Sequence, residues 1–254
     1  MLSPKLIAGL TVLLPCLLLG DSLLTQDAET DPDRKSPEAA MPLKELAPDR
    51  KIPPLDRVLA HAWGKDVSSH GEVERYLREL ARAAPFRSRL EKYGTSYEGR
   101  ALYYLAISSA ANIERLEEIR ENNLLLSDPR RGAPADVEKL IEEQPAIVWL
   151  SYSVHGDESS GTDAALLTAY HLLADLRQET RSMLEKLVVI IDPLQNPDGR
   201  DRFVNFHREN RGIAAGPDPL ASERAQRWPG DRFNHYLFDL NRDWYLQSQV
   251  EAGR

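Results

Sequence analysis

The sequence predicts an α/β fold, a three-layer α/β/α domain built around a mixed, mostly parallel sheet. Two short apolar runs, 146–152 and 187–191, are typical of core strands, and the apolar stretch 164–176 between them is typical of a buried helix. Strands that alternate with helices predict a sheet covered on both faces. In such sheets ligands bind beyond the carboxyl ends of the strands, and polar residues follow both runs.

The elements before these runs follow the same alternation. Residues 72–83 place Val73, Tyr76, Leu77 and Leu80 on one helical stripe. The next elements are expected in this order: a polar turn at 93–100, a strand at 101–107, a helix at 112–126, a break at 130–134 and a short helix at 136–143.

Polar residues bound the buried elements. Ser159 or Ser160 is expected to cap the helix through 164–176, because a serine hydroxyl accepts a hydrogen bond from a free amide of the first turn. Residues 192–199, which follow the strand at 187–191, predict a turn-rich loop.

The N-terminal segment predicts export from the cytoplasm. Lys5 precedes about a dozen apolar residues and then small or polar ones, which is typical of a secretory signal at 1–22. The run is short for a membrane span, so we expect a secreted or periplasmic protein with no stable span after signal removal; an uncleaved N-terminal anchor is the alternative. Residues 23–56, rich in Asp, Glu and Pro, predict a disordered linker before a domain at 57–254.

Composition argues against several classes of function. The net charge of −8 disfavours a general nucleic-acid binder, which needs a basic face. The single cysteine, Cys16, lies inside the predicted signal, so the mature chain is expected to have neither a disulfide framework nor a thiol nucleophile. The sequence contains no Gly-x-Ser-x-Gly motif of a serine hydrolase and no phosphate-binding loop.

His155 and Glu158 follow the strand at 146–152 and predict half of a metal site. Catalytic zinc sites use three protein ligands of the His and Glu type and leave one position for water. Each residue alone has a simpler explanation, His155 as a hydrogen-bonded surface histidine and Glu158 as an acid in the first turn of a helix. The pair at the end of a strand is better explained by a metal.

Four sequence blocks resemble the zinc carboxypeptidase family, the metallopeptidases related to carboxypeptidase A. In chain order they are Gly94 to Arg100, His155-Gly-Asp-Glu158, Asn196-Pro-Asp-Gly199 with Asn210-Arg211, and Asp239-Leu-Asn-Arg-Asp-Trp244. Each block alone is weak evidence, but four in the family's order are hard to produce by accident. The resemblance covers about residues 70–250 and implies the N-terminal part of a domain with the family's fold.

The resemblance implies roles for five residues. His155 and Glu158 would bind Zn²⁺. Arg211 would polarise the scissile carbonyl and stabilise the oxyanion, while Asn241 and Arg242 would bind the terminal carboxylate of a peptide or protein substrate. A guanidinium suits both tasks, because it binds a carboxylate through two parallel hydrogen bonds and offsets charge in a transition state. The implied activity is zinc-dependent removal of C-terminal residues by metal-activated water.

The chain departs from the family pattern in three respects. Asp157 stands where the digestive enzymes carry a basic substrate contact, which leaves the fine specificity open. The family's third zinc ligand, a histidine, and its general-base glutamate are both expected beyond Arg254. We therefore expect an incomplete domain with weak zinc affinity and little peptidase activity by itself. His207 and His235 stay open as substitutes for the third ligand.

Several alternatives remain at this stage. Arg208 competes with Arg211 for the catalytic role, and Arg242 could instead pair with Asp239 or Asp243. A related zinc amidohydrolase or deacylase, or a cell-wall peptide hydrolase, would have the same fold and a carboxylate-binding arginine. A peptide-binding pseudoenzyme that lacks the third ligand and the general base is the other alternative.

Overall fold

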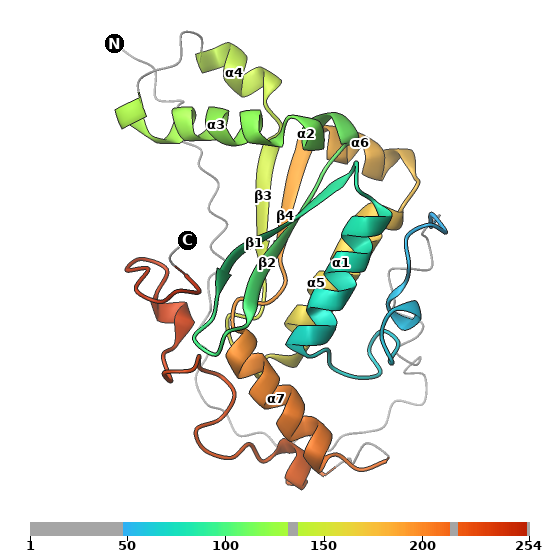
Figure 1. The fold of residues 1–254 in the computed structure, drawn as a ribbon, viewed down its shortest axis with the longest axis vertical. Coiled ribbons are helices and arrows are strands. Elements are labelled where there is room, and N and C mark those ends of the chain that lie inside the picture. Colours follow the sequence, from blue (N-terminus) through green and yellow to red (C-terminus); the bar gives the residue numbers. More distant parts are fainter. Residues whose placement is uncertain (1–47, 132–136, 214–217, 253–254) are drawn as a thin grey trace, which may run out of the picture. The chain divides into compact units, whose positions relative to one another are not determined.

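The computed structural model describes residues 48–131, 137–213 and 218–252, all within one compact unit that begins at Pro42 (Figure 1). The predicted signal at 1–22 and residues 23–47 of the predicted linker lie outside the described residues. No helix in the described ranges has both the length and the apolar content that a membrane crossing requires.

Four strands form one mixed sheet in the order β1-β2-β4-β3. They are β1 (Ser88–Thr95), β2 (Ala101–Ile107), β3 (Ala146–Ser151) and β4 (Leu187–Asp192). The pairs β1–β2 and β2–β4 are antiparallel, whereas β3 and β4 are parallel. The predicted α/β class and mixed sheet are therefore confirmed, but the expectation of a mostly parallel sheet is wrong for the described strands.

The lengths of the connections explain how the strands pair. A short turn at 96–100 joins β1 to β2, and so short a link permits only an antiparallel hairpin. Between β3 and β4 lie α5 (Ser159–Ala174) and α6 (Gln178–Lys186), which provide the long crossover that a parallel pair needs. The strand β1 was not predicted, because its sequence contains few apolar residues.

The remaining described elements are helices. The other α-helices are α1 (His70–Ala83), α2 (Ala110–Glu114), α3 (Leu116–Ser127), α4 (Val137–Glu143) and α7 (Pro197–Asn210). The 3-10 turns are η3 (Leu55–Arg57), η4 (Pro129–Arg131), η5 (Ser222–Arg224) and η6 (Leu240–Arg242). The helices predicted before residue 180 are thus confirmed, with the one at 112–126 divided between α2 and α3.

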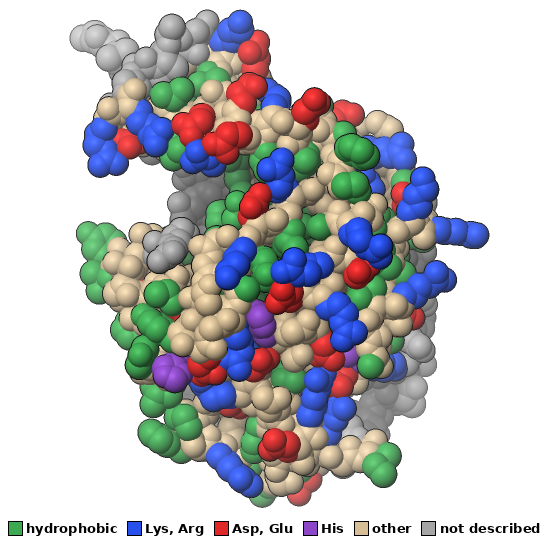
Figure 2. Space-filling model, in the orientation of Figure 1, with side chains coloured by type: hydrophobic (Ala, Val, Ile, Leu, Met, Phe, Trp, Pro, Cys, Tyr) green, Lys and Arg blue, Asp and Glu red, His purple; other side chains and the backbone are tan. Residues whose placement is uncertain are grey.

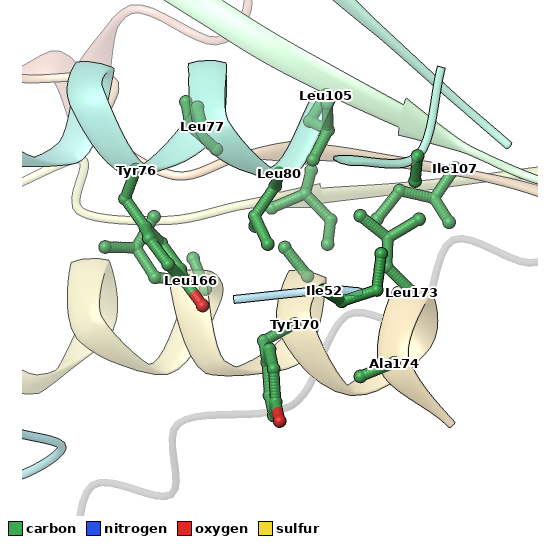
Figure 3. Close-up of a cluster of buried hydrophobic side chains, with 14 of the residues drawn as sticks. Ile52, Tyr76, Leu77, Leu80, Leu105, Ile107, Leu166, Tyr170, Leu173 and Ala174 are labelled. Atoms are coloured by element: carbon green, nitrogen blue, oxygen red, sulfur yellow. The ribbon is translucent and has the colours of Figure 1, made fainter. Parts of the chain in front are cut away.

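The hydrophobic core lies where α1 and α5 pack on the sheet (Figure 3). The predicted stripe on α1 is confirmed, since Val73, Tyr76, Leu77 and Leu80 are all buried. Their partners on α5 and on the central strands are Leu166, Leu173, Leu105, Ile107, Val189 and Ile191. Burial of each such side chain contributes on the order of 2 kcal/mol, so this layer holds the strand ends in place.

Residues 48–56 belong to the folded domain, which corrects the predicted end of the linker at residue 56. Ile52 and Leu55 are 2% and 0% exposed and lie in the core (Figure 3). Pro48 forms an isolated β-bridge with Asp175. Composition missed this segment, because two apolar side chains are enough to anchor a stretch that is otherwise rich in proline and charge.

The strand β3 lies at the edge of the sheet, which corrects its predicted burial. Ile147 and Trp149 are 37% and 51% exposed. Among the described strands, β3 pairs on one side only, with β4. Ala106 and Val188 point to the same face as Trp149 and are buried, so the exposure is confined to the edge.

The helix α7 replaces the turn-rich loop predicted at 192–199. Asn196 caps this helix, because its Oδ1 accepts a hydrogen bond from Gly199 N (2.9 Å), and Pro197 is its first residue. Both are helix-start signals that outweigh the turn propensity of this sequence. The predicted serine cap of α5 is also wrong: Glu158 occupies the cap position and makes no capping hydrogen bond with its side chain.

Charged side chains of both signs share the surface. On the face shown in Figure 2, acidic and basic groups are interspersed. On α1, for example, Arg78 pairs with Glu74 (2.7 Å). Exposed pairs of this kind contribute little to stability and mainly favour solubility.

Candidate metal and carboxylate site

The candidate site lies in the loop after β3, next to the loop after β4, at the carboxyl ends of the two parallel strands. Backbone hydrogen bonds join the loops, from Gln195 N to Tyr152 O (3.2 Å) and from Asn196 N to Ser153 O (3.1 Å). Ser153 has a positive φ of 51°, which turns the chain sharply. His155 then lies inside the protein, only 3% exposed. This is the position that the sheet rule predicts for a ligand site.

The imidazole of His155 lies between two carboxylates. Its Nδ1 is 2.8 Å from Glu158 Oε1, and its Nε2 is 2.8 Å from Asp239 Oδ1. A histidine that binds a metal through one nitrogen usually donates its other N–H to a carboxylate. The structure thus brings the predicted metal pair, His155 and Glu158, together.

The hydrogen-bond chemistry of this arrangement fits a bound cation. A neutral imidazole carries one N–H, and when Nε2 donates it to Asp239, Nδ1 presents a lone pair to Glu158. Two lone pairs 2.8 Å apart repel each other unless a proton or a metal ion lies between them. Nitrogen and carboxylate oxygen are both ligands that zinc accepts, so the residues present fit this metal.

Asp239 both orients His155 and begins η6, where its Oδ1 accepts a hydrogen bond from Asn241 N (3.0 Å). Burial by itself would raise the pKa of Asp239. The hydrogen bonds from His155 and Asn241 and the charge of Arg232 outweigh this effect, so its pKa lies below the usual value. Asp239 is therefore ionised at neutral pH. Sequence analysis missed this role and considered Asp239 only as a partner of Arg242.

Asn241 and Arg242 lie in η6, within one turn of Asp239, so the structure brings the predicted carboxylate-binding pair to the site. Trp244 Nε1 donates a hydrogen bond to Asn241 Oδ1 (3.0 Å), which leaves the Asn241 amide NH₂ free to donate to a ligand. Asn241 and Arg242 are both exposed.

The Arg242 guanidinium is available for a carboxylate. Within the described residues it bonds only to Asn241 O, at 3.5 Å. The structural alternative, a pair with Asp239 or Asp243, is not present. Asp243 instead accepts hydrogen bonds from Ser248 Oγ (2.6 Å) and other groups of the following turn.

Arg211 is not brought to the metal pair. It follows the last residue of α7, and its guanidinium pairs with Asp66 (2.7 Å). Arg208, the alternative, pairs with Glu72 (2.8 Å). The opposite end of α7 lies against Gly156, and a helix of this length rises about 20 Å. The prediction of Arg211 relied on its spacing from the start of a segment that is in fact a helix.

Arg232 is the guanidinium that lies beside the pair. Its Nη1 is 3.6 Å from Glu158 Oε1, and its Nη2 is 3.7 Å from Asp239 Oδ2. Its backbone carbonyl accepts hydrogen bonds from Asn196 Nδ2 (2.9 Å) and Gly156 N (3.3 Å). Sequence analysis did not single out Arg232, because it lies in the long connection between α7 and η6, where spacing says little about position.

Neither His207 nor His235 joins the metal pair. His207 stacks on Phe203 of the same helix, with 6.1 Å between ring centroids. His235 Nδ1 lies 3.1 Å from Glu98 Oε1. In the part of the chain that the structure describes, no three His, Cys, Asp or Glu side chains are grouped so that they could hold a metal.

Fold and site together define a class: α/β proteins with a histidine–carboxylate pair at the end of a parallel strand and an exposed arginine in the adjoining turn. A family model described as zinc carboxypeptidase matches residues 73–253, and the chain belongs to this family. The resemblance seen in the four sequence blocks is thereby confirmed.

Solved carboxypeptidase structures are also similar to the chain at low identity. Carboxypeptidase A from Helicoverpa armigera is 20% identical, with 78% of this chain and 49% of that chain covered and a TM-score of 0.41. Bovine thrombin-activatable fibrinolysis inhibitor, in complex with tick carboxypeptidase inhibitor, is 16% identical, with 74% and 53% covered and a TM-score of 0.41. The chain thus spans about half the length of both.

Proposed function

We propose that this protein is a zinc-dependent metallocarboxypeptidase that hydrolyses C-terminal residues from peptides or proteins. The observation that carries the proposal is the position of the His155 ring, 2.8 Å from both Glu158 and Asp239. In this proposal His155 and Glu158 hold the metal, and Asp239 keeps the ring in the correct tautomer. When bound, zinc would polarise the peptide carbonyl and lower the pKa of a water molecule.

Two arginines are proposed to bind the substrate. Arg242, with the Asn241 amide, would bind the terminal carboxylate, because a guanidinium offers two parallel donors to it. Arg232 would stabilise the oxyanion, the role that the resemblance assigned to Arg211. Its distance of 3.6 Å from Glu158 supports this choice, because a preorganised charge acts where negative charge develops.

We also propose that the protein acts outside the cytoplasm, secreted or periplasmic, after removal of residues 1–22. Determination of the N-terminus after expression in a secreting host tests this. An intact Met1 in the membrane fraction would instead support the anchored alternative.

Zinc titration tests the proposed metal pair. The wild-type chain is expected to bind one zinc ion weakly, and His155→Ala and Glu158→Gln are expected to abolish this binding. Asp239→Asn should weaken binding about tenfold or more, because the carboxylate partner of a metal-binding histidine typically contributes that much. Competition with a coloured chelator measures each affinity.

His171→Ala is a matched control for the zinc titration. His171 lies in α5 and also faces an acid, Asp175, at 3.7 Å, but it is not part of the site. Its substitution should leave zinc binding unchanged. Tight one-to-one binding that survives His155→Ala would contradict the proposal and would point to another ligand set, such as one with His207 or His235.

A peptide-binding protein without catalysis is the second candidate. The observation that favours it is the lack of a third grouped metal ligand across the described ranges 48–131, 137–213 and 218–252. Turnover separates the candidates. Hydrolysis of a peptide with a free C-terminal carboxylate, lost in His155→Ala, supports the peptidase. Binding of that peptide without turnover supports the second candidate, and hydrolysis of acyl-amino acids alone would indicate an amidohydrolase.

A further inference from the structure

A short segment, residues 230–234, carries Arg232 to the metal pair; we name it the Arg232 strap. No described helix or strand contains it, so other contacts must set its position. Two of them are the hydrogen bonds that the Arg232 carbonyl accepts from Asn196 and Gly156. A larger set comes from Arg202, in the second turn of α7.

Arg202 binds three backbone carbonyls of the strap. Its Nε donates to Gly230 O (3.4 Å). Its Nη2 donates to Phe233 O and, at 3.2 Å, to Asn234 O. These carbonyls lie on both sides of Arg232 in the sequence. One guanidinium therefore holds the strap before and after the residue that reaches the site.

The turn at 96–100 holds Arg202 from the other side. Glu98 Oε1 is 3.4 Å from Arg202 Nη1. The turn is itself anchored to α7, because Ser96 Oγ donates to the buried Asp198 (2.7 Å) and Arg100 Nη1 donates to the same carboxylate (2.8 Å). The sequence block from 94 to 100 thus braces α7 and Arg202.

The strap also has no room to slide on the site loop. A Cβ on Gly156 would lie 2.3 Å from Asp231 O, and a Cβ on Gly199 would lie 2.5 Å from the same atom. The strap backbone therefore packs directly on two glycines, one in the loop after β3 and one in the first turn of α7. Loss of the Arg202 bonds would leave this packing as the main restraint on Arg232.

From these contacts we infer that Arg202 is a positioning residue, which holds the strap so that the Arg232 guanidinium lies beside Glu158 and Asp239. The inference rests on the proposed function and extends it from the groups at the site to the group that places one of them. A cation held at this point is preorganised for an oxyanion. It also opposes the binding of a metal ion to Glu158, because like charges repel.

Zinc affinity therefore provides a test with a distinctive sign. Arg232→Met is expected to tighten zinc binding by about threefold or more, since one nearby positive charge is removed. Arg202→Met should tighten it in the same direction, because it releases Arg232. The double variant should bind no more tightly than Arg232→Met alone, since both substitutions remove the same interaction. General damage to the site would weaken zinc binding instead.

Arg208→Met is the matched control. Arg208 lies on the same helix, has a similar exposure and also bonds a carbonyl and an acid, Val67 O (2.9 Å) and Glu72 (2.8 Å), but it does not contact the strap. Its substitution should leave zinc affinity unchanged. Weaker zinc binding by Arg202→Met, or effects that multiply in the double variant, would overturn the inference.

A second measurement separates this inference from the proposed function. If no form of the chain binds zinc, the proposed metal pair fails, but amide hydrogen exchange still reports on the strap. The Gly156 amide, which donates to Arg232 O, should exchange faster in Arg202→Met than in the wild type or in Arg208→Met. Equal rates in all three would overturn the positioning role.

Discussion

Asp192 shows how burial changes the chemistry of a single carboxyl. It lies at the end of β4, where Tyr93 donates a hydrogen bond to its Oδ2 (3.0 Å). Removal from water raises the pKa of Asp192 to about 7, although the hydrogen bonds from Tyr93 and the Leu194 amide act in the opposite direction. In the folded protein this carboxyl therefore keeps its proton well above the pH at which an unfolded aspartate loses it.

This shift predicts a pH-dependent stability that Asp192→Asn removes. The folded state binds the proton more tightly, so the free energy of unfolding falls as pH rises from about 4 to about 7. The neutral amide cannot ionise, so the variant should gain stability relative to the wild type across this window and no further above it. Urea unfolding at several pH values measures the difference.

Asp218→Asn is the control for this pH series, because Asp218 is exposed. Its unfolding curve should move with pH as the wild type does. Parallel pH profiles for the wild type and Asp192→Asn would show that Asp192 is already ionised in the folded protein, contrary to this prediction.

At the scale of secondary-structure elements, three backbone segments meet at Gly156. A Cβ there would lie 2.1 Å from Gly199 C and 2.3 Å from Asp231 O. Both obstacles are backbone atoms, which cannot move aside as a flexible side chain can. The loop after β3, the start of α7 and the Arg232 strap can therefore pack at this distance only because position 156 is glycine.

Gly156→Ala is accordingly expected to destabilise the protein by about 2 kcal/mol or more, because the three segments must separate. Gly71→Ala is the matched control: Gly71 lies in α1, and a Cβ there would meet no described atom within 4 Å, so alanine should be neutral or stabilise by up to about 1 kcal/mol. Chemical denaturation measures both. Equal effects of the two substitutions would show that the close approach at 156 is not rigid.

Prediction of the elements succeeded where apolar periodicity was strong. The stripe of α1 and the runs of β2 and β4 were found from sequence, because one buried face forces the pattern. It failed for β1, whose pairing with β2 carries its stability, and for α7, whose start was interpreted as a turn. In both elements tertiary contacts and capping outweigh hydrophobic pattern.

At the scale of the whole molecule, residues 48–56 are part of the domain. Leu55 is 0% exposed within the core formed with α1 and α5. Leu55→Ala should therefore cost about 2–5 kcal/mol of unfolding free energy, as other large-to-small core substitutions do. Leu220→Ala is the matched control, because Leu220 is 86% exposed and its loss should change stability by less than about 0.5 kcal/mol. Thermal unfolding that does not distinguish the two would return this segment to the linker.

The sequence by itself determined the residue types of the site and their local order. His155 and Glu158 are three positions apart at the end of a strand, and Asn241 and Arg242 are adjacent, so short-range geometry already brings each pair together. The family followed from the same blocks. These features depend on neighbours in the chain, which is why they can be recognised without a structure.

Only the tertiary structure decided which distant groups meet at that site. Asp239 reaches the His155 ring, Arg232 replaces Arg211 beside the pair, and the sheet is more antiparallel than predicted. The physical reason is that such contacts join segments separated by long connections. Their positions are set by packing against glycine and by hydrogen bonds to backbone carbonyls, and neither leaves a periodic signal in the sequence.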